Sequence, residues 1–213
     1  MTVRADLNLS IDGVAATADQ TPENVFGEDW GRLVAPYVAT RTFRDRVLHD
    51  GTGEGTTGVD DRYAQAYFES VGAEIMGAGM FGFHTFPDNP DWRGWWGEEP
   101  PFRVTVLVLT HTVRPPIEFP NGTRFEFRAT TPLEALEEAR RLAGDGDIRI
   151  GGGVSVVREF LKAGLIDRLH VALTPIVLGR GVRLWDDLVE LERDYAVTSE
   201  VAESGVIHVT FTR

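Results

Sequence analysis

Apolar and polar residues alternate with a period of two in three segments of the chain. The alternation over residues 3–10 predicts a half-buried strand, and residues 195–200 and 206–212 alternate in the same way. The last two segments are joined through Glu203, Ser204 and Gly205, which predicts an antiparallel hairpin. Residues 104–109 are apolar and β-branched almost without interruption, which favours a central strand that is covered on both faces.

Helical spacing of apolar residues dominates elsewhere. A first helical region extends from Thr21 through residues 30–38, with a kink or a break at Pro36. Residues 50–58 are rich in glycine and threonine and predict a loop, a candidate lid, before a helix that opens at Asp60 or Asp61. Further along, Thr131 and Pro132 begin a helix that ends at Gly144, with Leu133, Leu136 and Leu142 on its apolar face.

Strands and helices that follow one another in this way predict an α/β protein. A short apolar strand at residues 73–76 and a loop at residues 84–101 complete the pattern. We expect one sheet, mixed but mostly parallel, with helices on both faces and the hairpin at its C-terminal end. A length of 213 residues with 42% hydrophobic residues suffices for a single domain over residues 1–213.

Composition narrows the functional classes. The chain has no cysteine, which excludes disulfides, thiolate catalysis and cysteine-ligated metals and fits a reducing cytoplasm. Its net charge of −12 argues against nucleic acid or an anionic membrane surface as a partner. No signal pattern and no apolar run of roughly 18 residues occurs, so we expect a soluble cytoplasmic protein. Motifs of serine hydrolases, zinc proteases and Walker-type nucleotide sites are absent, and no metal site is predicted.

Three consecutive glycines are the strongest candidate site. Ile150 ends a strand, Gly151, Gly152 and Gly153 make the turn, and Val154 and Ser155 begin a helix. Backbone N–H groups at a helix N-terminus, together with the helix dipole, favour an anion such as a dinucleotide pyrophosphate. The alternative is a tight strand-to-helix turn that binds nothing.

Two further turns follow predicted strands. One contains Gly77, Ala78, Gly79 and Met80, and the other contains Thr110, His111 and Thr112. Ligands of open α/β sheets bind beyond the carboxyl ends of the strands, so the three turns are candidates for one extended ligand. Either turn is also compatible with a purely structural role.

Asp12 and the tryptophans are candidates for the substrate side. Asp12 could orient a substrate or deliver a proton, although an Asp-Gly pair is also common in turns. Trp95 and Trp96, with Trp92, could stack on a flat ring or pack against the core or a partner subunit.

Several of these segments together resemble the dihydrofolate reductase-like superfamily. They are residues 8–16, residues 150–153 and residues 165–181, with the sequences NLSIDGVAA, IGGG and LIDRLHVALTPIVLGRG. The chain is similar, over nearly its whole length, to the branch that contains the reductase domain of the bifunctional riboflavin-biosynthesis deaminase-reductase. The resemblance implies a three-layer α/β/α fold, a homodimer, and an enzyme that uses NADPH, or alternatively NADH, to reduce a small planar heterocycle of the pterin or pyrimidine class, or a carbonyl or imine compound.

The resemblance also implies roles for individual residues. Ala16 would border the nicotinamide, Gly77 and Met80 the phosphates, and Thr110, His111 and Thr112 the adenosine side, while Ile150 to Ser155 would hold the pyrophosphate. Relatives usually carry an arginine after the glycine that corresponds to Gly77, whereas this chain has Ala78 and Gly79. An arginine there can bind the 2′-phosphate of NADPH, and Arg114 is a candidate replacement. The alternative function is a non-reducing binding protein, or a specialised biosynthetic catalyst, on the same fold.

Overall fold

A computed structural model describes residues 1–21, 23–83 and 85–213 of the chain. Its main sheet has nine strands within these residues, in the order β10-β11-β8-β1-β7-β3-β4-β6-β5. The strands are β1 (Val3–Ser10), β3 (Val71–Gly77), β4 (Thr105–Leu109), β5 (Ile117–Glu118), β6 (Arg124–Arg128), β7 (Asp147–Gly152), β8 (Arg168–Thr174), β10 (Ala196–Val201) and β11 (Ile207–Thr212). A separate small sheet pairs β2 (Val14–Ala16) with β9 (Val182–Arg183).

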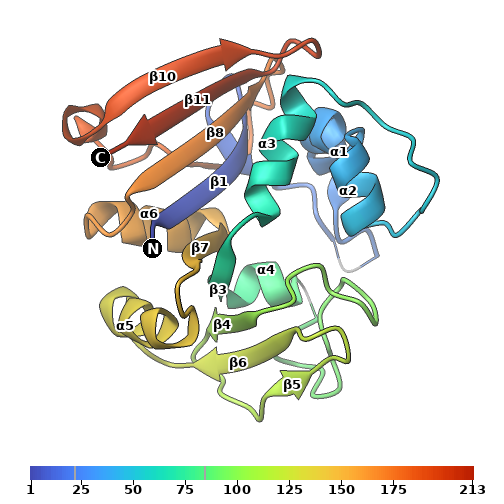
Figure 1. The fold of residues 1–213 in the computed structure, drawn as a ribbon, viewed down its shortest axis with the longest axis vertical. Coiled ribbons are helices and arrows are strands. Elements are labelled where there is room, and N and C mark those ends of the chain that lie inside the picture. The colour runs from blue at the N-terminus through green and yellow to red at the C-terminus, as the bar shows by residue number, and fades with distance from the viewer. Residues whose placement is uncertain (22, 84) are drawn as a thin grey trace. The chain divides into compact units, whose positions relative to one another are not determined.

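Helices lie between many of these strands along the chain, and three of them follow one another before β3. The helices are α1 (Gly27–Val38), α2 (Arg41–Arg46), α3 (Val59–Phe68), α4 (Ala78–Gly82), α5 (Pro132–Leu142), α6 (Val154–Lys162) and the 3-10 helix η1 (Leu191–Asp194). Parallel pairs join β1, β7, β3, β4 and β6, and antiparallel pairs join β8 to β11, β11 to β10 and β6 to β5 (Figure 1). The predicted mixed and mostly parallel sheet with a C-terminal hairpin is confirmed.

Contacts between Cα atoms divide the chain into two compact units. The first unit is Met1–Ala5 with Ser70–Asp167, and the second is Asp6–Glu69 with Arg168–Arg213. The boundary therefore passes through β1, between Ala5 and Asp6. The expectation of one domain over residues 1–213 stays a prediction.

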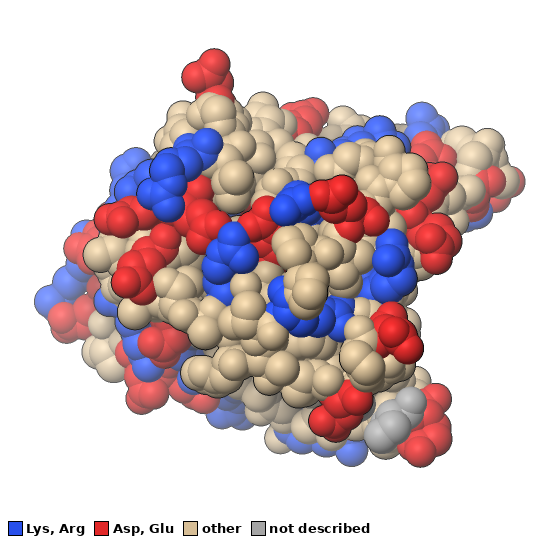
Figure 2. Space-filling model, turned by 90° about the horizontal axis from the view of Figure 1, so that it is seen from below, with Lys and Arg blue, Asp and Glu red and all other residues tan. Residues whose placement is uncertain are grey.

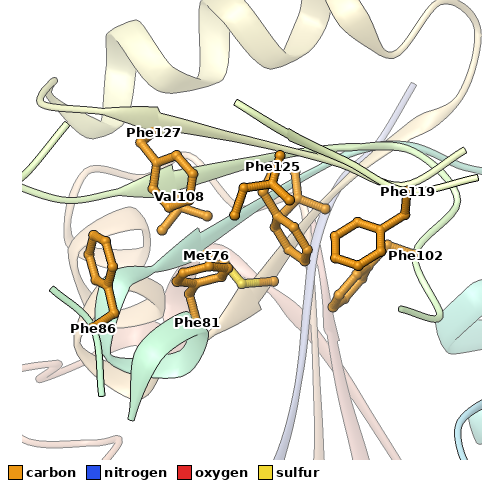
Figure 3. Packing of buried hydrophobic residues seen from close by; sticks show 10 residues of the cluster. Met76, Phe81, Phe86, Phe102, Val108, Phe119, Phe125 and Phe127 are labelled. Carbon is orange, nitrogen blue, oxygen red and sulfur yellow. The ribbon is translucent and has the colours of Figure 1, made fainter. Parts of the chain in front are cut away.

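Alternation along β6 separates the two faces of the sheet in the first unit. Arg128 points toward α5, where its guanidinium binds the carboxylate of Glu138. Phe125 and Phe127 point the other way and join a buried aromatic cluster near α4. Figure 3 shows these rings on the opposite side of the strands from α5, packed with Phe81, Phe86 and Met76. Phe125, Phe127 and Phe81 are fully buried, so this cluster is a hydrophobic core on one face of the sheet in the first unit.

The N-terminal helical region differs from the prediction. Helix α1 begins at Gly27, six residues after the predicted start at Thr21, and Pro22 of the predicted region lies outside the described residues. The carboxylate of Asp19 accepts the N–H groups of Glu28 and Asp29, so a side chain from the preceding segment caps the helix. Pro36 lies in the last turn and does not divide α1.

Other predictions hold in outline and differ in detail. Residues 50–58 lie between helices without an element of their own, and α3 begins at Val59, beside the predicted Asp60. The turn after β3 is a short helix, α4. Helix α5 has the predicted Thr131 cap as part of a capping box, but Leu133 and Leu142 are exposed, and Ala135, Leu136 and Ala139 make its buried face. The prediction of the apolar face was wrong at these two leucines because the buried side of α5 runs through positions 135, 136 and 139.

Charged side chains of both signs are interspersed over the face that Figure 2 shows, so the net charge of −12 does not form a single acidic patch there. No helix within the described ranges combines the length and the apolar character that crossing a bilayer requires.

Candidate functional site

The three predicted turns lie side by side at one edge of the sheet. Strand β7 pairs with β3, with Gly152 opposite Met76, and β3 pairs with β4, with Gly77 opposite Leu109. All three strands are parallel, so their carboxyl ends meet at the same edge. The turns that follow Gly77, Leu109 and Gly152 are thus brought together by the topology alone. Ligand binding by their residues stays a prediction.

The three consecutive glycines have three different surroundings. A Cβ atom on Gly151 would overlap the Oε1 atom of Glu74 on β3, so this glycine makes room for a buried carboxylate. Gly152 has a φ of +119° and lies against the sulfur of Met80, which is 3.1 Å from the position of a Cβ. Both glycines are buried and serve the packing of the turn.

Gly153 is the open member of the set. No described heavy atom outside its chain neighbours lies within 4 Å of where its Cβ would be. It precedes Val154, the first residue of α6, and its carbonyl accepts the N–H groups of Val156 and Val157. The N–H groups of the first helical turn have no partner within a helix and point out from its N-terminus. The open space at Gly153 thus adjoins a helix N-terminus, where N–H groups without helical partners favour an anion.

The α4 turn is fastened from the side by two indoles. Trp92 donates its Nε1–H to the carbonyl of Phe81 at 3.0 Å, and Trp95 donates to the carbonyl of Met80 at 3.0 Å. Trp96 stacks on Trp95 and on Phe125, with ring centroids 4.5 Å and 5.6 Å apart. The packing alternative for these rings is therefore supported. Substrate contact by Trp95 and Trp96 stays a prediction.

The turn after β4 is mostly exposed. Thr110 is half-buried and receives the N–H of Thr112 on its hydroxyl at 3.0 Å, while His111 and Thr112 are exposed. Arg114 follows this turn, but its guanidinium lies over the rings of Phe127, Phe86 and Phe81.

Arg114 also has partners for its N–H groups. It donates to the carbonyl of Pro90 at 2.9 Å and to the carbonyl of Trp92. Burial, and secondarily the nearby Arg93, lowers the pKa of Arg114. The guanidinium holds the segment around Pro90 against the aromatic cluster, so the hypothesis that it replaces the missing phosphate ligand loses its support.

In the second unit, Asp12 is surrounded by donors. Its carboxylate accepts the hydroxyl of Ser10 at 2.6 Å and the N–H groups of Leu178 at 3.1 Å and Gly179 at 2.9 Å. The Ser10 hydroxyl and then the two backbone N–H groups lower the pKa of Asp12 to about 2, against the opposing effect of burial. The ionised side chain thus holds the backbone of residues 178 and 179 in place. These contacts favour the structural role in a turn that the Asp-Gly pair also allowed. A catalytic or substrate-binding role stays a prediction.

Ala16 ends β2 and pairs with Val182 of β9. Gly181, with a φ of +116°, lies so close to Ala16 that a Cβ would overlap the Ala16 carbonyl oxygen. The neighbouring Arg180 donates to the buried carboxylate of Asp29 on α1 at 2.7 Å. Residues 178–181 are therefore held at one end by Asp12 and further along by Asp29, and they fix the backbone of Ala16.

Sequence reasoning missed the buried charges of the central strands. Arg149 on β7 binds Glu74 on β3, and both side chains are almost fully buried. A charged residue in an apolar strand, as in Ile148-Arg149-Ile150, was the available signal. Asp29, which is also buried and was also missed, has a weaker sequence signal. It lies in the first turn of α1, where acidic residues are common even when they are exposed.

One cavity of about 500 Å³ lies elsewhere in the second unit. It is lined by Trp30, Gly31, Val34, Ala35, Val38, Ala39, Arg44, Leu48 and Asp50, and it contains none of the predicted site residues.

A family comparison matches most of the chain. The model of the family described as the RibD C-terminal domain matches residues 1–203. Among curated proteins, the uncharacterized protein YyaP of Bacillus subtilis strain 168 is 31% identical over 79 residues. That match covers 37% of this chain and 42% of YyaP.

Two solved structures share the fold. A putative riboflavin biosynthesis protein from Shewanella sp. PV-4 has a TM-score of 0.57 and 21% identity, and the match covers 100% of this chain and 99% of that chain. A diaminohydroxyphosphoribosylaminopyrimidine deaminase/5-amino-6-(5-phosphoribosylamino)uracil reductase from Thermotoga maritima has a TM-score of 0.53 and 14% identity. There the match covers 99% of this chain and 56% of the bifunctional protein.

Proposed function

The chain belongs to the RibD C-terminal domain family, and on this premise we propose that it is a reductase that uses a nicotinamide dinucleotide. The observation that carries the proposal is the open space beside Gly153, the residue that precedes the first residue of α6. Its substrate is proposed to be a small planar heterocycle of the pyrimidine or pterin class, or a related carbonyl or imine compound.

The residues present fit such a dinucleotide. The backbone from Gly152 to Ser155 would hold the pyrophosphate, because no described heavy atom outside the chain neighbours of Gly153 lies within 4 Å of the position of a Cβ on this residue. Gly77 and Met80 would border the phosphates, Thr110, His111 and Thr112 the adenosine, and Ala16 the nicotinamide. When bound, the reduced nicotinamide supplies the hydride.

The protein is proposed to contribute position more than proton transfer. The backbone of Ala16 is fixed by Gly181 and β9, and Asp12 holds the adjoining segment in place through its carboxylate. A group with a pKa of about 2 is ionised throughout the neutral range and holds no proton to deliver. We therefore propose that Asp12 orients residues 178 and 179 for the reaction.

Titration of the purified protein with NADPH and with NADH tests the proposal. Calorimetry should give a Kd on the order of 1 μM to 1 mM for at least one of them. Binding of neither dinucleotide at about 1 mM would overturn the reductase proposal. Light scattering on the same sample measures whether the chain forms the proposed homodimer.

A second candidate function is a binding protein or a specialised catalyst that does not reduce its ligand. Ala78 and Gly79 favour it, since they stand where relatives carry an arginine, and Arg114 is engaged with Pro90 and Trp92. Dinucleotide binding without oxidation of the reduced form by any pterin or pyrimidine would support this alternative.

A further inference from the structure

Two buried histidines of the second unit lie in a row between two carboxylates. His170 Nδ1 is 3.1 Å from Asp6 Oδ1, His170 Nε2 is 2.9 Å from His208 Nδ1, and His208 Nε2 is 2.8 Å from Asp60 Oδ1. The four residues, which we call the histidine row, come from β1, β8, β11 and α3. His170 is 6% exposed and His208 is 3% exposed, so bulk water is kept from both rings.

Tyr63 closes one side of the histidine row. Its ring stacks on His170 with centroids 4.4 Å apart and on His208 with centroids 4.1 Å apart. The planes are tilted by only 11° and 2°. Both imidazoles are thus held nearly parallel, with their nitrogen atoms directed at the partners in the row.

The three contacts need three protons. An ionised carboxylate only accepts, so His170 Nδ1 and His208 Nε2 must each donate a proton to their aspartates. A neutral imidazole carries a single N–H, which leaves the other nitrogen as an acceptor. Two neutral rings would therefore direct two lone pairs at each other across 2.9 Å. A third proton between the rings turns this repulsive contact into a hydrogen bond.

The surroundings decide which ring carries it. Burial is the largest effect on His208 and lowers its pKa, Asp60 opposes the change, and the charge of His170 adds to it. His208 is then the neutral ring, and the third proton belongs to His170, which faces Asp6. Around the row, Arg168 lies 4.0 Å from Asp6, Glu200 of β10 is opposite His208 in the ladder, and Arg62 pairs with Glu200 and lies over Tyr63.

We propose that the histidine row binds one proton more than two neutral histidines would, and that His170 holds this proton as an imidazolium. The proton completes the series of hydrogen bonds that connects α3 with the strands β1, β8 and β11. The inference is independent of the proposed cofactor. It predicts a stability maximum along the pH scale. Free histidine titrates near pH ~6.5, so above that pH the unfolded chain loses protons that the folded row keeps, and stability falls as pH rises.

Acid has its own effect on the same row. Below pH ~6.5 the unfolded chain protonates both histidines, whereas the folded row keeps His208 neutral. The unfolded state then binds more protons than the folded state, so stability also falls as pH decreases.

Nitrogen-15 NMR of the histidine rings tests the proposal, because imidazolium and the two neutral tautomers have distinct shifts. At pH 8 we expect an imidazolium signal from His170 and the signal of the neutral Nε2–H tautomer from His208. Two neutral rings at pH 8 in the native protein would overturn the proposal.

Asp60→Asn removes the need for the third proton. The new amide would donate to His208 Nε2, His208 Nδ1–H would donate to His170, and His170 Nδ1–H would donate to Asp6. We expect loss of the imidazolium at pH 8 and a tautomer change at His208. An imidazolium that persists unchanged would contradict the proton count.

The matched control is Asp61→Asn on the same helix turn. The Asp61 carboxylate accepts from Thr42 N and Gln65 Nε2 and is not part of the row. Asp61→Asn should leave the signals of both histidine rings unchanged. Loss of the imidazolium signal in this variant would contradict its assignment to the histidine row. If Asp60→Asn does not fold, Asp6→Asn makes the equivalent change at the other end, with His208 keeping its Nε2–H tautomer.

Discussion

The carboxylate of Glu74 lies where a side chain on Gly151 would have to go. Glu74 is also bound by Arg149 and has no exposed surface, so it cannot move aside into water. The first of the three glycines is consequently required by the ion pair inside the sheet, and a ligand is not needed to explain it.

Gly151→Ala should therefore destabilise the protein. Overpacking of a buried site costs about 1–3 kcal/mol, and the added methyl group would also disturb the Arg149 contact. Urea unfolding measures the change. Gly31→Ala is the control, since Gly31 lies in α1 with open space around it and should be neutral or up to about 1 kcal/mol more stable. Equal stabilities of the two variants would contradict the steric argument.

Gly153→Asp should leave the stability of the protein nearly unchanged and weaken its binding of a dinucleotide. The open space admits the side chain, so the unfolding free energy should change by less than about 1 kcal/mol. A carboxylate in front of the α6 N–H groups competes with phosphate, and we expect about 10- to 100-fold weaker dinucleotide binding, or roughly 1.4–2.8 kcal/mol. Calorimetric titration of the folded variant, with Gly31→Ala beside it, gives the ratio. An affinity equal to that of the native protein would contradict the proposal that the phosphates bind beside Gly153.

The role of Asp12 can be read from pH dependence. Its folded pKa of about 2 lies below the ordinary value of 3.8, so its contribution to stability is present above pH 3.8 and is lost as the pH falls toward 2. Asp12→Asn should flatten this acid limb in unfolding experiments and cost about 1 kcal/mol at pH 7.

Activity provides the second measurement for Asp12. If the protein has the proposed reductase activity and the carboxylate only orients residues 178 and 179, the pH–rate profile between pH 5 and 9 should have the same shape in Asp12→Asn and in the native protein. Disappearance of one limb of that profile would instead identify Asp12 as the proton donor.

Arg114→Ala should act on stability and leave cofactor choice alone. The variant loses the stacking on three phenylalanine rings and two hydrogen bonds to backbone carbonyls, which we expect to cost about 1–3 kcal/mol. Arg114→Lys keeps the charge without the planar fork and should recover part of the loss. The ratio of the Kd values for NADPH and NADH should stay the same in both variants, and a selective loss of NADPH would restore Arg114 as a phosphate ligand.

The fold was predictable where local patterns and packing agree. The strands at residues 3–10 and 104–109 and the final hairpin lie where their alternating or apolar runs predict them, and Thr131 with Pro132 placed α5 within a residue. The predicted half-burial of residues 3–10 was wrong, because β1 is an interior strand on which the consecutive residues Val3, Arg4 and Ala5 are all buried. Strand β6 was missed although its sequence, RFEFR, alternates strictly between charged and aromatic residues, which is the period-two signal of a strand. The partner of its charged face, Glu138 on α5, is visible only in the structure. The start of α1 was missed because its cap is Asp19, a side chain distant from the helix start in sequence.

For the site, the sequence alone placed the three turns at one edge of the sheet. It could not show which of the three glycines is required by packing and which lies beside open space. Gly151, Gly152 and Gly153 are identical as letters and differ only in what their neighbours in space require. The engagement of Arg114 and the donors around Asp12 are likewise long-range contacts, so no local pattern announces them.

The two indole hydrogen bonds onto α4 carry a consequence for sequence variation among relatives. Because Trp95 and Trp92 bind the carbonyls of Met80 and Phe81, a change in the length or conformation of residues 92–96 is transmitted to the backbone of the β3 turn. The loop and the turn are thus expected to diverge together, as one inherited module, so that grafting the turn of a relative onto this chain should succeed only when its tryptophan loop is transferred with it.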